Sequence, residues 1–393
     1  MENVGFRAIG VDKNPRIIEQ LKEKRMPFIE AGCQDLLDKS KLGLATNLDM
    51  LKCCTNIIIT VGTPLLQHIE TDLSQIKEVI IGISKNLCKG QNIVLRSTLA
   101  PKTTEFVSLL IKKETGFENG KDYFLSFCPE RIAEGKALKE LNELPQIIGA
   151  NDDESFLVAE TIFSKLTKDI IRMSYREAEL VKLFNNVSRY ISFAVANQFA
   201  LVAESYNVDA SKIINASNYK YPRNKISMPG LTAGTCLRKD FGMINEASPY
   251  PDLLLSSWKI NEYMPKFLVE SLLKETPING KAVGVLGYSF KRDTDDTRDS
   301  LVPKLIRYIE REVPSKIRIH DPYLPQVIDS LHENCDLDDV LQKSDVIFIA
   351  TNHSQFDNIN LSANNIKPGI WICDIWNVLG STKLVFRLEE DAE

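Results

Sequence analysis

The stretch NIVLRSTLAPKTTEFVSLLIKKETGFENGKDYFLSFCP, residues 92–129, contains two apolar runs separated by an amphipathic segment. The runs NIVLRST (92–98) and YFLSFCP (123–129) are short and closed by turn or polar residues, which predicts buried strands. Between them, TEFVSLLIKKE (104–114) has apolar residues at three- and four-residue spacing, which predicts a helix. A strand, a helix and a strand in this order form a βαβ unit of a parallel sheet.

The alternation of predicted strands and helices continues on both sides of this unit. Two long segments interrupt it. REAELVKLFNNVSRYISFAVANQFALVAESYNV (176–208) has no Gly or Pro and keeps an apolar stripe, and DLLLSSWKINEYMPKFLVESLLKE (252–275) is also helical in pattern. A helix of about 30 residues usually forms a spine between domains or a dimer interface. The other predicted strands are 6–12, 56–64, 146–150, 169–174, 282–290, 316–323, 345–352 and 369–377, and the other helices are 15–24, 73–87 and 301–312.

The predicted fold class is therefore α/β, with two Rossmann-like parallel-sheet domains joined by a long central helix and a helical dimerisation region. A chain of 393 residues is too long for one ordinary core, which agrees with several domains. We expect the domains to span 1–175, 176–275 and 276–393.

Composition narrows the class of protein. Hydrophobic residues make up 44% of the chain and charged residues 26%, which is typical of a globular protein, and a net charge of −5 argues against nucleic acid as the main partner. The sequence has no apolar run of membrane-spanning length, and MENVGFRAIG has no signal-peptide pattern. None of the eight cysteines has zinc-type spacing. We therefore expect a cytoplasmic protein without a structural metal or a membrane partner.

The predicted strand 6–12 ends in Asp12. An acidic residue at the end of the second strand of a dinucleotide-binding fold binds the adenosine ribose, and the GxGxxG phosphate loop lies about 20 residues earlier. Here that position falls before Met1, and the chain contains no GxGxxG elsewhere. We therefore expect a domain truncated at its start, whose sheet lacks a central strand and exposes apolar edges. Alternatively, Asp12 is only a turn former at the end of a strand.

Two pairs of polar residues are spaced for one helix face. Lys182 and Asn186 are four residues apart in AELVKLFNN, and Cys236 and Asp240 are four apart in GTCLRKD. If Cys236 opens a helix, the helix dipole favours its thiolate, and the preceding PGLTAG supplies a flexible loop. Each pair also has a structural interpretation, because a lone Cys is usually a small core residue and Lys182 can be a solvated helix residue.

A third stretch, CPERIAEG (128–135), places Glu130 and Glu134 after a predicted strand. The carboxyl ends of strands form the usual rim of an α/β active site, so both carboxylates are candidate site residues. Alternatively, Glu130 only caps the following turn.

These stretches, in this order, resemble the UDP-glucose/GDP-mannose dehydrogenase family along almost the whole chain. The resemblance implies NAD binding by residues 1–175, UDP-sugar binding by 276–393, a homodimer through the long helix and a role in polysaccharide biosynthesis. The runs that carry it are VGTP (61–64), STLAP (97–101), CPERIAEG (128–135), AELVKLFNN (178–186), PGLTAGTCLRKD (229–240), GYSFKRDTDDTRDS (287–300) and DVIFIATNH (345–353).

The resemblance implies a four-electron oxidation of a primary alcohol to a carboxylate through a thioester. In this scheme Cys236 is the nucleophile, and Lys182 and Asn186 stabilise oxyanions at the reacting carbon. Asp240, with Thr98, orders or activates the hydrolytic water. A thiolate that captures the aldehyde prevents its escape before the second hydride transfer.

The resemblance also assigns the remaining site residues. Glu130 serves acid–base or water-positioning work, Lys291 contacts the nucleotide-sugar together with Lys182, and Arg223 reaches the substrate site of the partner subunit. The cofactor-side positions are Asp12, Thr63, Thr98, Glu134 and Arg298.

Two departures from the family pattern bear on the substrate and the activity. The loop GLTAGTC carries Leu231, Thr232 and Ala233 where many relatives are richer in glycine, and CPER in place of NPEF favours the UDP-N-acetylmannosamine or UDP-N-acetylglucosamine branch. Two other functions remain open. One is a two-electron hydroxy-acid-type dehydrogenase, which needs no thiol, and the other is an inactive nucleotide-sugar-binding protein without the phosphate loop.

Overall fold

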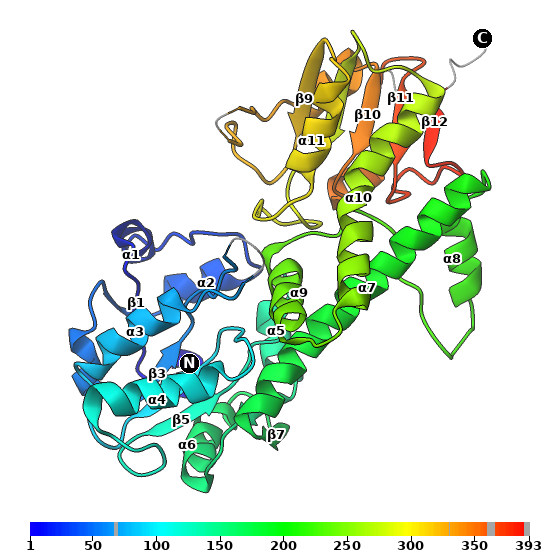
Figure 1. Cartoon of the computed structure of the whole chain (residues 1–393). Helices are drawn as coiled ribbons and strands as arrows, with labels where there is room; N and C mark the ends of the chain where they lie inside the picture. Colours follow the sequence, from blue (N-terminus) through cyan, green and yellow to red (C-terminus); the bar gives the residue numbers. More distant parts are fainter. Residues whose placement is uncertain (67–69, 330, 360–365, 389–393) are drawn as a thin grey trace. The chain divides into compact units, whose positions relative to one another are not determined.

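The computed structural model describes residues 1–66, 70–329, 331–359 and 366–388. By its internal contacts the chain forms two compact units, the first made of Met1–Val187 and Lys239–Ser248 and the second of Ser188–Arg238 and Pro249–Glu393. Two of the three division points lie inside helices, α7 (Tyr175–Ser205) and α9 (Thr235–Ala247), and the third lies between Ser248 and Pro249, just after α9 (Figure 1). The division into three sequence segments at 175 and 276 stays a prediction.

The first unit is built on a five-stranded sheet in the order β3-β4-β5-β6-β7. Neighbouring strands are parallel except β5 and β6, which run antiparallel and so depart from the all-parallel sheet predicted from the sequence. Every strand of this sheet lies inside a predicted range. The strands are β3 (Asn56–Ile59), β4 (Asn92–Leu95), β5 (Phe124–Phe127), β6 (Gln146–Gly149) and β7 (Ile170–Met173).

Side-chain alternation along β4 assigns helices to the two faces of this sheet. Ile93 and Leu95 point into the apolar cluster that contains the buried residues of α3 (Ser74–Ser84) and α4 (Thr103–Thr115). Val94 points into the opposite cluster, with Ala159 and Phe163 of α6 (Asp153–Phe163). The sheet is therefore covered on both faces, as parallel sheets require.

A separate, two-stranded parallel sheet is formed by β1 (Ile9–Val11) and β2 (Gly43–Ala45). Among the described residues β1 pairs only with β2, and β3 pairs only with β4. Val11 in β1 is 38% exposed, an apolar side chain at the edge of this ribbon.

The second unit contains another five-stranded sheet, in the order β12-β11-β10-β8-β9, with only the edge strand β12 antiparallel (Figure 1). Val283 and Val285 of β8 pack with α10 and α11, whereas Ile347 and Ile349 of β10 pack with α12 on the other face. The strands are β8 (Ala282–Leu286), β9 (Lys316–His320), β10 (Val346–Ile349), β11 (Trp371–Asp374) and β12 (Val385–Arg387), and the helices are α10 (Asp252–Glu275), α11 (Val302–Arg311) and α12 (Leu337–Lys343).

The long helix α7 begins one residue before its predicted start and ends three residues before its predicted end. Asn207, with a positive φ of 53°, stops it, and the backbone N–H of Val208 closes the last turn on the carbonyl of Ala203. The remaining helices are α1 (Pro15–Lys22), α2 (Cys33–Lys39), α5 (Ala137–Glu143) and α8 (Ala210–Asn218), with short 3-10 turns at Glu2–Val4, Asp49–Cys53 and Ser354–Asn358.

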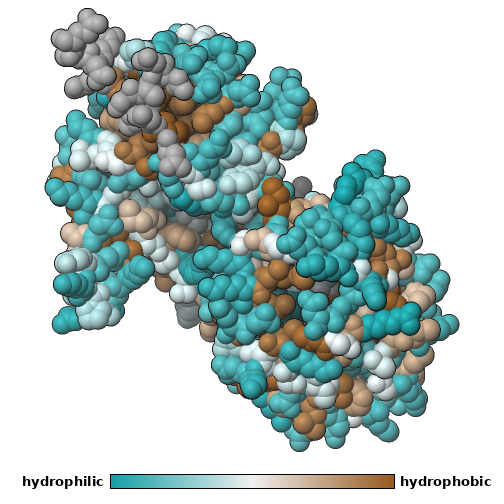
Figure 2. Space-filling view, turned by 180° about the vertical axis from the view of Figure 1, so that it is seen from behind, coloured by the Kyte–Doolittle hydropathy of each residue, from teal (hydrophilic) through white to brown (hydrophobic). Residues whose placement is uncertain are grey.

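The surface is mainly polar. Figure 2 shows hydrophilic side chains over most of the visible face, with hydrophobic patches between them. Within the described part of the chain, none of the helices combines the length and the apolar character needed to span a bilayer.

Candidate active site

The first unit brings Asp240 of α9 into contact with Asn186 of α7. The Asn186 side-chain amide donates to Asp240 Oδ2 at 2.5 Å, and the Asp240 side chain is fully buried. The second oxygen, Oδ1, has no hydrogen-bond partner within the described ranges. A buried acceptor without a partner is costly, so this atom marks a place where a bound water or ligand group is needed.

The charge around Asp240 is set by the same helices. Burial raises the pKa of the Asp240 carboxyl above its ordinary value of 3.8, whereas the positive charge of Lys239, the hydrogen bond from Asn186 and the positive charge of Lys182 act in the opposite direction. Lys182 stands one turn before Asn186 on α7. Two residues that the sequence placed on one helix face thus act on a carboxyl group 54 and 58 positions further along the chain.

Lys239 is a site residue that the sequence reasoning missed. Its Nζ donates to Thr63 Oγ1 at 3.1 Å, and Thr63 in turn donates to the Thr98 carbonyl at 2.6 Å. This chain of contacts ties α9 to the loops that follow β3 and β4. The sequence pointed to Lys239 only through its position, directly before Asp240 and three residues after Cys236. Periodicity alone does not show which helix face these residues share.

Glu130 is held by Arg96 and by backbone groups of its own loop, and its acid–base or water-positioning role stays a prediction. Its carboxylate forms an ion pair with Arg96 and also accepts from the backbone N–H groups of Arg131, at 2.8 Å, and Ile132, at 3.2 Å. Arg96 also donates to the Cys128 carbonyl at 3.1 Å. The cation and the two backbone donors that hold this carboxylate organise the CPER loop.

Glu134 lies further along the same loop. Glu30 binds the backbone that follows it, accepting from the N–H of Gly135 at 2.8 Å and from that of Ala137 at 3.0 Å. Glu30 therefore fixes the backbone that carries Glu134, and the sequence reasoning missed it.

Asp12 and the two threonines provide a test of fit for NAD. Asp12 follows β1, and its Oδ1 accepts from the Asn14 backbone N–H at 2.8 Å, which leaves Oδ2 for a ribose hydroxyl. Thr63 and Thr98 follow β3 and β4, at the strand ends where ligands of open α/β sheets bind. The residues present therefore fit a dinucleotide at these positions, while the chain contains no GxGxxG for its pyrophosphate.

The second unit holds Cys236, the second residue of α9, with an exposed side chain. The loop before it is fixed at Gly234, which has a φ of 97° and donates from its backbone N–H to the Asp299 carbonyl at 3.3 Å. A Cβ at Gly234 would lie 2.5 Å from the Phe290 ring. Arg238 adds an ion pair to Asp299 at 3.4 Å. The loop of the thiol and the loop after β8 are thus packed together within one unit.

Three further predicted residues lie in the second unit. Lys291 sits in the loop after β8, directly after Phe290. Arg298, which was predicted on the cofactor side, is exposed. Its guanidinium donates to both carboxylate oxygens of Asp296. Arg223 is also exposed and lies 5.7 Å from the centroid of the Tyr221 ring. The described contacts of Arg298 and Arg223 do not bring either residue to Cys236.

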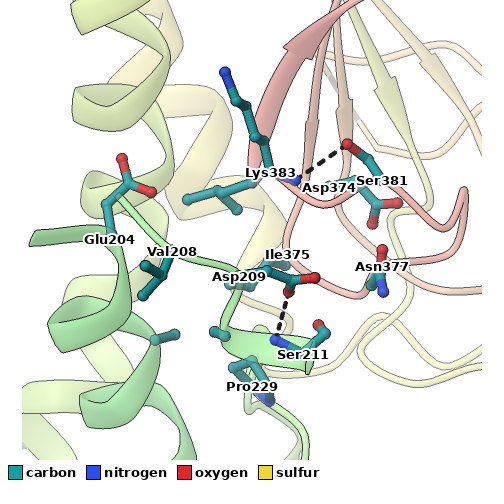
Figure 3. A pocket seen from close by; sticks show the side chains of 13 residues that line it. Glu204, Val208, Asp209, Ser211, Pro229, Asp374, Ile375, Asn377, Ser381 and Lys383 are labelled. Atoms are coloured by element: carbon teal, nitrogen blue, oxygen red, sulfur yellow. Dashed lines mark hydrogen bonds between the residues drawn. The ribbon is translucent and has the colours of Figure 1, made fainter. Parts of the chain in front are cut away.

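A separate hollow in the second unit lies between α7, α8 and the loop after β11 (Figure 3). Its cavity volume is about 40 Å³, far below the roughly 300 Å³ of a small-molecule site. None of the residues predicted as site residues lines it; Glu204, Asp209, Asp374 and Lys383 do. This hollow is therefore too small to hold a nucleotide-sugar.

The chain matches three domains of one family: the NAD binding domain of the UDP-glucose/GDP-mannose dehydrogenase family over residues 1–167, its central domain over 176–263 and its UDP binding domain over 284–381. It is 32% identical over 368 residues to the UDP-N-acetyl-D-mannosamine dehydrogenase of Pyrococcus horikoshii, covering 91% of this chain and 86% of that protein.

Two solved structures share the fold. A UDP-D-ManNAc dehydrogenase from Pyrococcus horikoshii has a TM-score of 0.86 at 29% identity, covering 95% of this chain and 94% of the other. A UDP-glucose dehydrogenase from Pyrobaculum islandicum has a TM-score of 0.84 at 26% identity, covering 95% and 89%. The resemblance drawn from the sequence motifs is confirmed, and with it the α/β fold class. The chain belongs to the UDP-glucose/GDP-mannose dehydrogenase family, with NAD as its cofactor.

Proposed function

We propose that this NAD-dependent nucleotide-sugar dehydrogenase oxidises the C6 alcohol of a UDP-N-acetylhexosamine to the uronic acid, through a thioester on Cys236. The observation that carries the proposal is the buried Asn186–Asp240 pair, whose Asp240 Oδ1 has no partner among the described residues and whose helix also carries Cys236 one turn earlier. Thioester hydrolysis needs a group that takes a proton from water, and a buried carboxyl with one oxygen unpaired among the described residues supports Asp240 in that role.

The reaction proceeds through groups of this chain. NAD, when bound, accepts one hydride from the alcohol and one from the covalent adduct. After the alcohol becomes an aldehyde, the Cys236 thiolate adds to its carbon and the oxygen takes a proton, which gives a thiohemiacetal. Loss of a hydride and a proton from this adduct gives the thioester, and water then releases the carboxylic acid and restores the thiol.

Lys182 and Asn186 support the steps in which negative charge develops on the substrate oxygen. An ammonium and an amide donor at four-residue spacing on one rigid helix are preorganised for such charge. Asp240 lies against this pair and takes the proton of the attacking water, with Thr98 at the neighbouring strand end. Removal of one oxyanion donor typically lowers the rate by about 10²–10³.

The N-acetylated substrate is supported by the CPER sequence at 128–131 and by the relatives. The dehydrogenase of Pyrococcus horikoshii carries the name UDP-N-acetyl-D-mannosamine dehydrogenase, and a relative from Pseudomonas aeruginosa, 26% identical and covering 92% of this chain and 88% of that protein, is named UDP-N-acetyl-D-glucosamine 6-dehydrogenase. Free thiols at all the cysteines also suit a reducing cytoplasm, where we place the reaction.

The decisive measurement counts NADH per sugar consumed. Two NADH and a uronic acid are expected for the wild type, and Cys236→Ser should stop acid formation, because an alcohol oxygen does not form a thioester. Cys88→Ser, a change at another exposed thiol, should leave the yield unchanged. One NADH per substrate supports a two-electron hydroxy-acid-type dehydrogenase instead, and full turnover to the acid by Cys236→Ser removes the proposed nucleophile.

We also propose that the enzyme is a homodimer through the second half of α7. Val195, Phe199, Val202 and Tyr206 follow one another at four-, three- and four-residue spacing, and each is between 42% and 76% exposed. An exposed apolar stripe of this length on one helix is typical of a protein interface. In such a dimer Arg223 is the residue expected to reach the partner's substrate site.

A further inference from the structure

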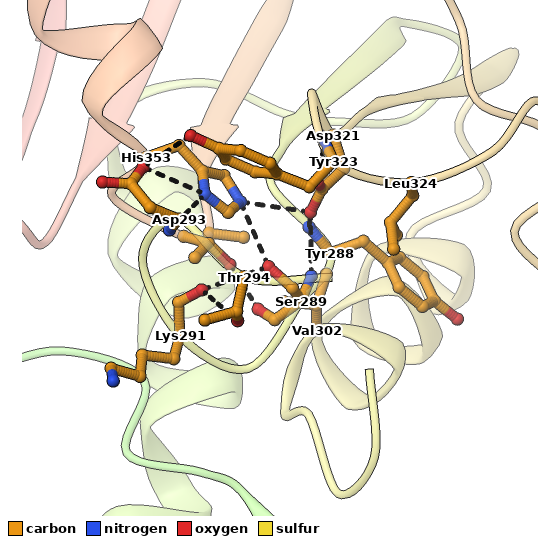
Figure 4. Close-up of polar contacts among 12 residues, drawn as sticks. Tyr288, Ser289, Lys291, Asp293, Thr294, Val302, Asp321, Tyr323, Leu324 and His353 are labelled. Carbon is orange, nitrogen blue, oxygen red and sulfur yellow. Dashed lines mark hydrogen bonds and ion pairs between the residues drawn. The ribbon is translucent and has the colours of Figure 1, made fainter. Parts of the chain in front are cut away.

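Lys291 lies in a loop that the ends of three strands hold in place. The loop follows β8, and the residues that bind it come from the segment after β9, which carries Asp321, and the segment after β10, which carries His353 (Figure 4). Both side chains are fully buried. A buried carboxyl and a buried imidazole in contact are expensive unless every polar atom is paired, so their partners are informative.

Asp321 binds the first residues of the loop. Its Oδ2 accepts from the backbone N–H groups of Tyr288, at 2.8 Å, and Ser289, at 2.9 Å. Its Oδ1 accepts from the Tyr323 N–H at 3.0 Å. Burial raises the pKa of the Asp321 carboxyl, but the hydrogen bond from His353 and the backbone donors of Ser289 and Tyr288 outweigh it and lower the pKa to about 2. The group is therefore a carboxylate that fixes the backbone by charge-assisted bonds.

His353 binds the loop on both sides of Lys291. Its Nδ1 accepts from the Asp293 backbone N–H at 2.9 Å, so the ring proton lies on Nε2. Nε2 lies 3.1 Å from both Asp321 Oδ2 and Ser289 Oγ. The Tyr323 ring, with its centroid 5.1 Å from that of the imidazole, packs against it. One imidazole ring thus holds the loop two residues before and two residues after Lys291.

The backbone of Lys291 is held directly as well. Its carbonyl accepts from Ser289 Oγ at 3.2 Å and from Thr294 Oγ1 at 3.1 Å. Asp293 has a positive φ of 57°, a conformation that a non-glycine residue keeps only when its surroundings impose it. Figure 4 shows the Lys291 side chain extending away from His353 and Asp321. The network therefore fixes the base of a side chain whose ammonium lies elsewhere.

We propose that His353 and Asp321 are positioning residues for Lys291, holding its ammonium in place for the nucleotide-sugar. This inference rests on the proposed function and on the nucleotide-sugar contact that the family resemblance implies for Lys291. A Ser–His–Asp hydrolase triad is a different arrangement, because here Ser289 and Asp321 approach the same ring nitrogen and the other nitrogen accepts a backbone N–H.

Two conservative variants separate the two contacts of His353. In His353→Asn the side-chain oxygen can still accept from the Asp293 N–H, but the donor to Ser289 and Asp321 is lost. In His353→Gln the amide nitrogen can still reach Ser289 and Asp321, but the acceptor for Asp293 is lost. We expect both variants to weaken binding less than His353→Ala, which loses both contacts. A residue that only fills space would also leave Ala weakest, so His353→Leu, which is similar to His in volume but makes neither contact, is the control. It should bind as weakly as His353→Ala, and binding by it as tight as that of the Asn and Gln variants contradicts the positioning role.

The test is a double-variant cycle read by calorimetric titration of the full-length chain with UDP-N-acetylmannosamine. Lys291→Met should weaken binding about tenfold or more, the size of a lost charge-assisted hydrogen bond. His353→Ala should weaken it by a similar factor, and the double variant should bind within about twofold of Lys291→Met, because a positioning residue has nothing left to position. Thermal unfolding of each variant checks that it folds, and the Asn and Gln variants replace Ala if it does not.

Several outcomes overturn the proposal. Equal effects of His353→Ala in the wild type and in the Lys291→Met background show independent action, and unchanged binding by Lys291→Met, or no binding by the wild type, removes the role of Lys291. The NADH count tests the proposed function separately. If the enzyme makes two NADH but the two substitutions act additively on binding, the proposed function stands and the positioning role is wrong. If the substitutions are non-additive but the chain makes no NADH, the positioning role stands and the proposed function is wrong.

Discussion

Asp240 accepts a hydrogen bond from Asn186 with one carboxylate oxygen. Its other carboxylate oxygen is also buried and has no hydrogen-bond partner among the described residues. Sequence spacing predicted that Lys182 and Asn186 share a helix face, but not that Asn186 contacts Asp240, because periodicity describes one helix at a time. Lys239 and Arg96 were missed for the same reason. Each acts through a partner more than 30 positions away in the sequence, Thr63 for Lys239 and Glu130 for Arg96.

Replacing Asp240 by Asn should separate thioester formation from hydrolysis. The amide keeps the size of the side chain but cannot take a proton from water, so we expect the rate of acid release to fall by about 10²–10³. Substrate should then remain attached to Cys236, which mass spectrometry of the quenched enzyme detects as an adduct. Asp35→Asn, at an exposed carboxyl in the first turn of α2, is the matched control. Rapid acid release by Asp240→Asn contradicts the assigned role.

Asp321 links stability to pH. Its pKa is lowered from an ordinary 3.8 to about 2, so the folded state favours its charged form by about 2 kcal/mol. A lowered pKa of an acid stabilises the fold above the unfolded pKa, and the contribution is lost as pH falls from about 4 toward 2. Asp321→Asn should therefore unfold at lower urea than the wild type at pH 7, with a gap that narrows below pH 4.

The control for this prediction is Asp338→Asn, at an exposed carboxyl in the first turn of α12 in the same unit. Its urea midpoint should follow that of the wild type at every pH. A gap for Asp321→Asn that stays constant from pH 7 to pH 3 would show that the carboxylate charge is not what stabilises this loop.

At the scale of elements, prediction from sequence worked best where a segment was long or fully apolar. The strands of both large sheets, except β12, and the helices α7 and α10 follow their predicted ranges, because Gly and Pro are missing from α7 and these strands are continuous apolar runs. The strands β2 and β12, three residues each, were missed, since three residues are too few to establish a period of two. Helix α9 was expected only on the condition that Cys236 opens it, and it begins at Thr235.

The loop before α9 depends on the absence of a side chain at Gly234. Its φ of 97° is unfavourable for other residues, and an added Cβ would meet the Phe290 ring at 2.5 Å. Gly234→Ala should therefore displace both Cys236 and Phe290, the residue before Lys291. We expect a loss of at least about tenfold in kcat/KM and a lower unfolding temperature, measured by initial rates and calorimetry.

Gly116→Ala is the comparison for this change. Gly116 also has a positive φ, 75°, but a Cβ there meets nothing within 4 Å, so this variant carries the backbone strain without the clash. It should lose some stability and keep its activity. Equal activity of the two alanine variants would show that the Phe290 contact does not matter for the thiol.

For the whole molecule, the sequence pattern indicated three segments, and the contacts of the fold define two units that divide inside α7, inside α9 and after Ser248. No linker composition marks the first two points, because a helix that passes from one unit to the next has no break in its pattern. The proposed site residues are divided accordingly, with Lys182, Asn186 and Asp240 in the first unit and Cys236 and Lys291 in the second.

The proposed dimer predicts the mass of the assembled enzyme. Phe199→Glu places a charge in the middle of the apolar stripe of α7, where desolvation of the carboxylate opposes association. Size-exclusion chromatography with light scattering should show a dimer for the wild type and a monomer for this variant. Leu109→Glu, at a 69% exposed leucine of α4 in the first unit, should stay dimeric. A monomeric wild type excludes the proposed interface.

The shared helix α9 has a consequence for how this enzyme can vary. Cys236 and Asp240 keep their relation only through the pitch of the helix between them, in which each residue turns the chain by about 100°. Substitutions at the intervening positions leave that angle alone, but one inserted or deleted residue rotates the nucleophile away from the water-binding acid. We therefore expect insertions and deletions in the surface loops of this protein. Between residues 236 and 240 we expect substitutions but no insertion or deletion.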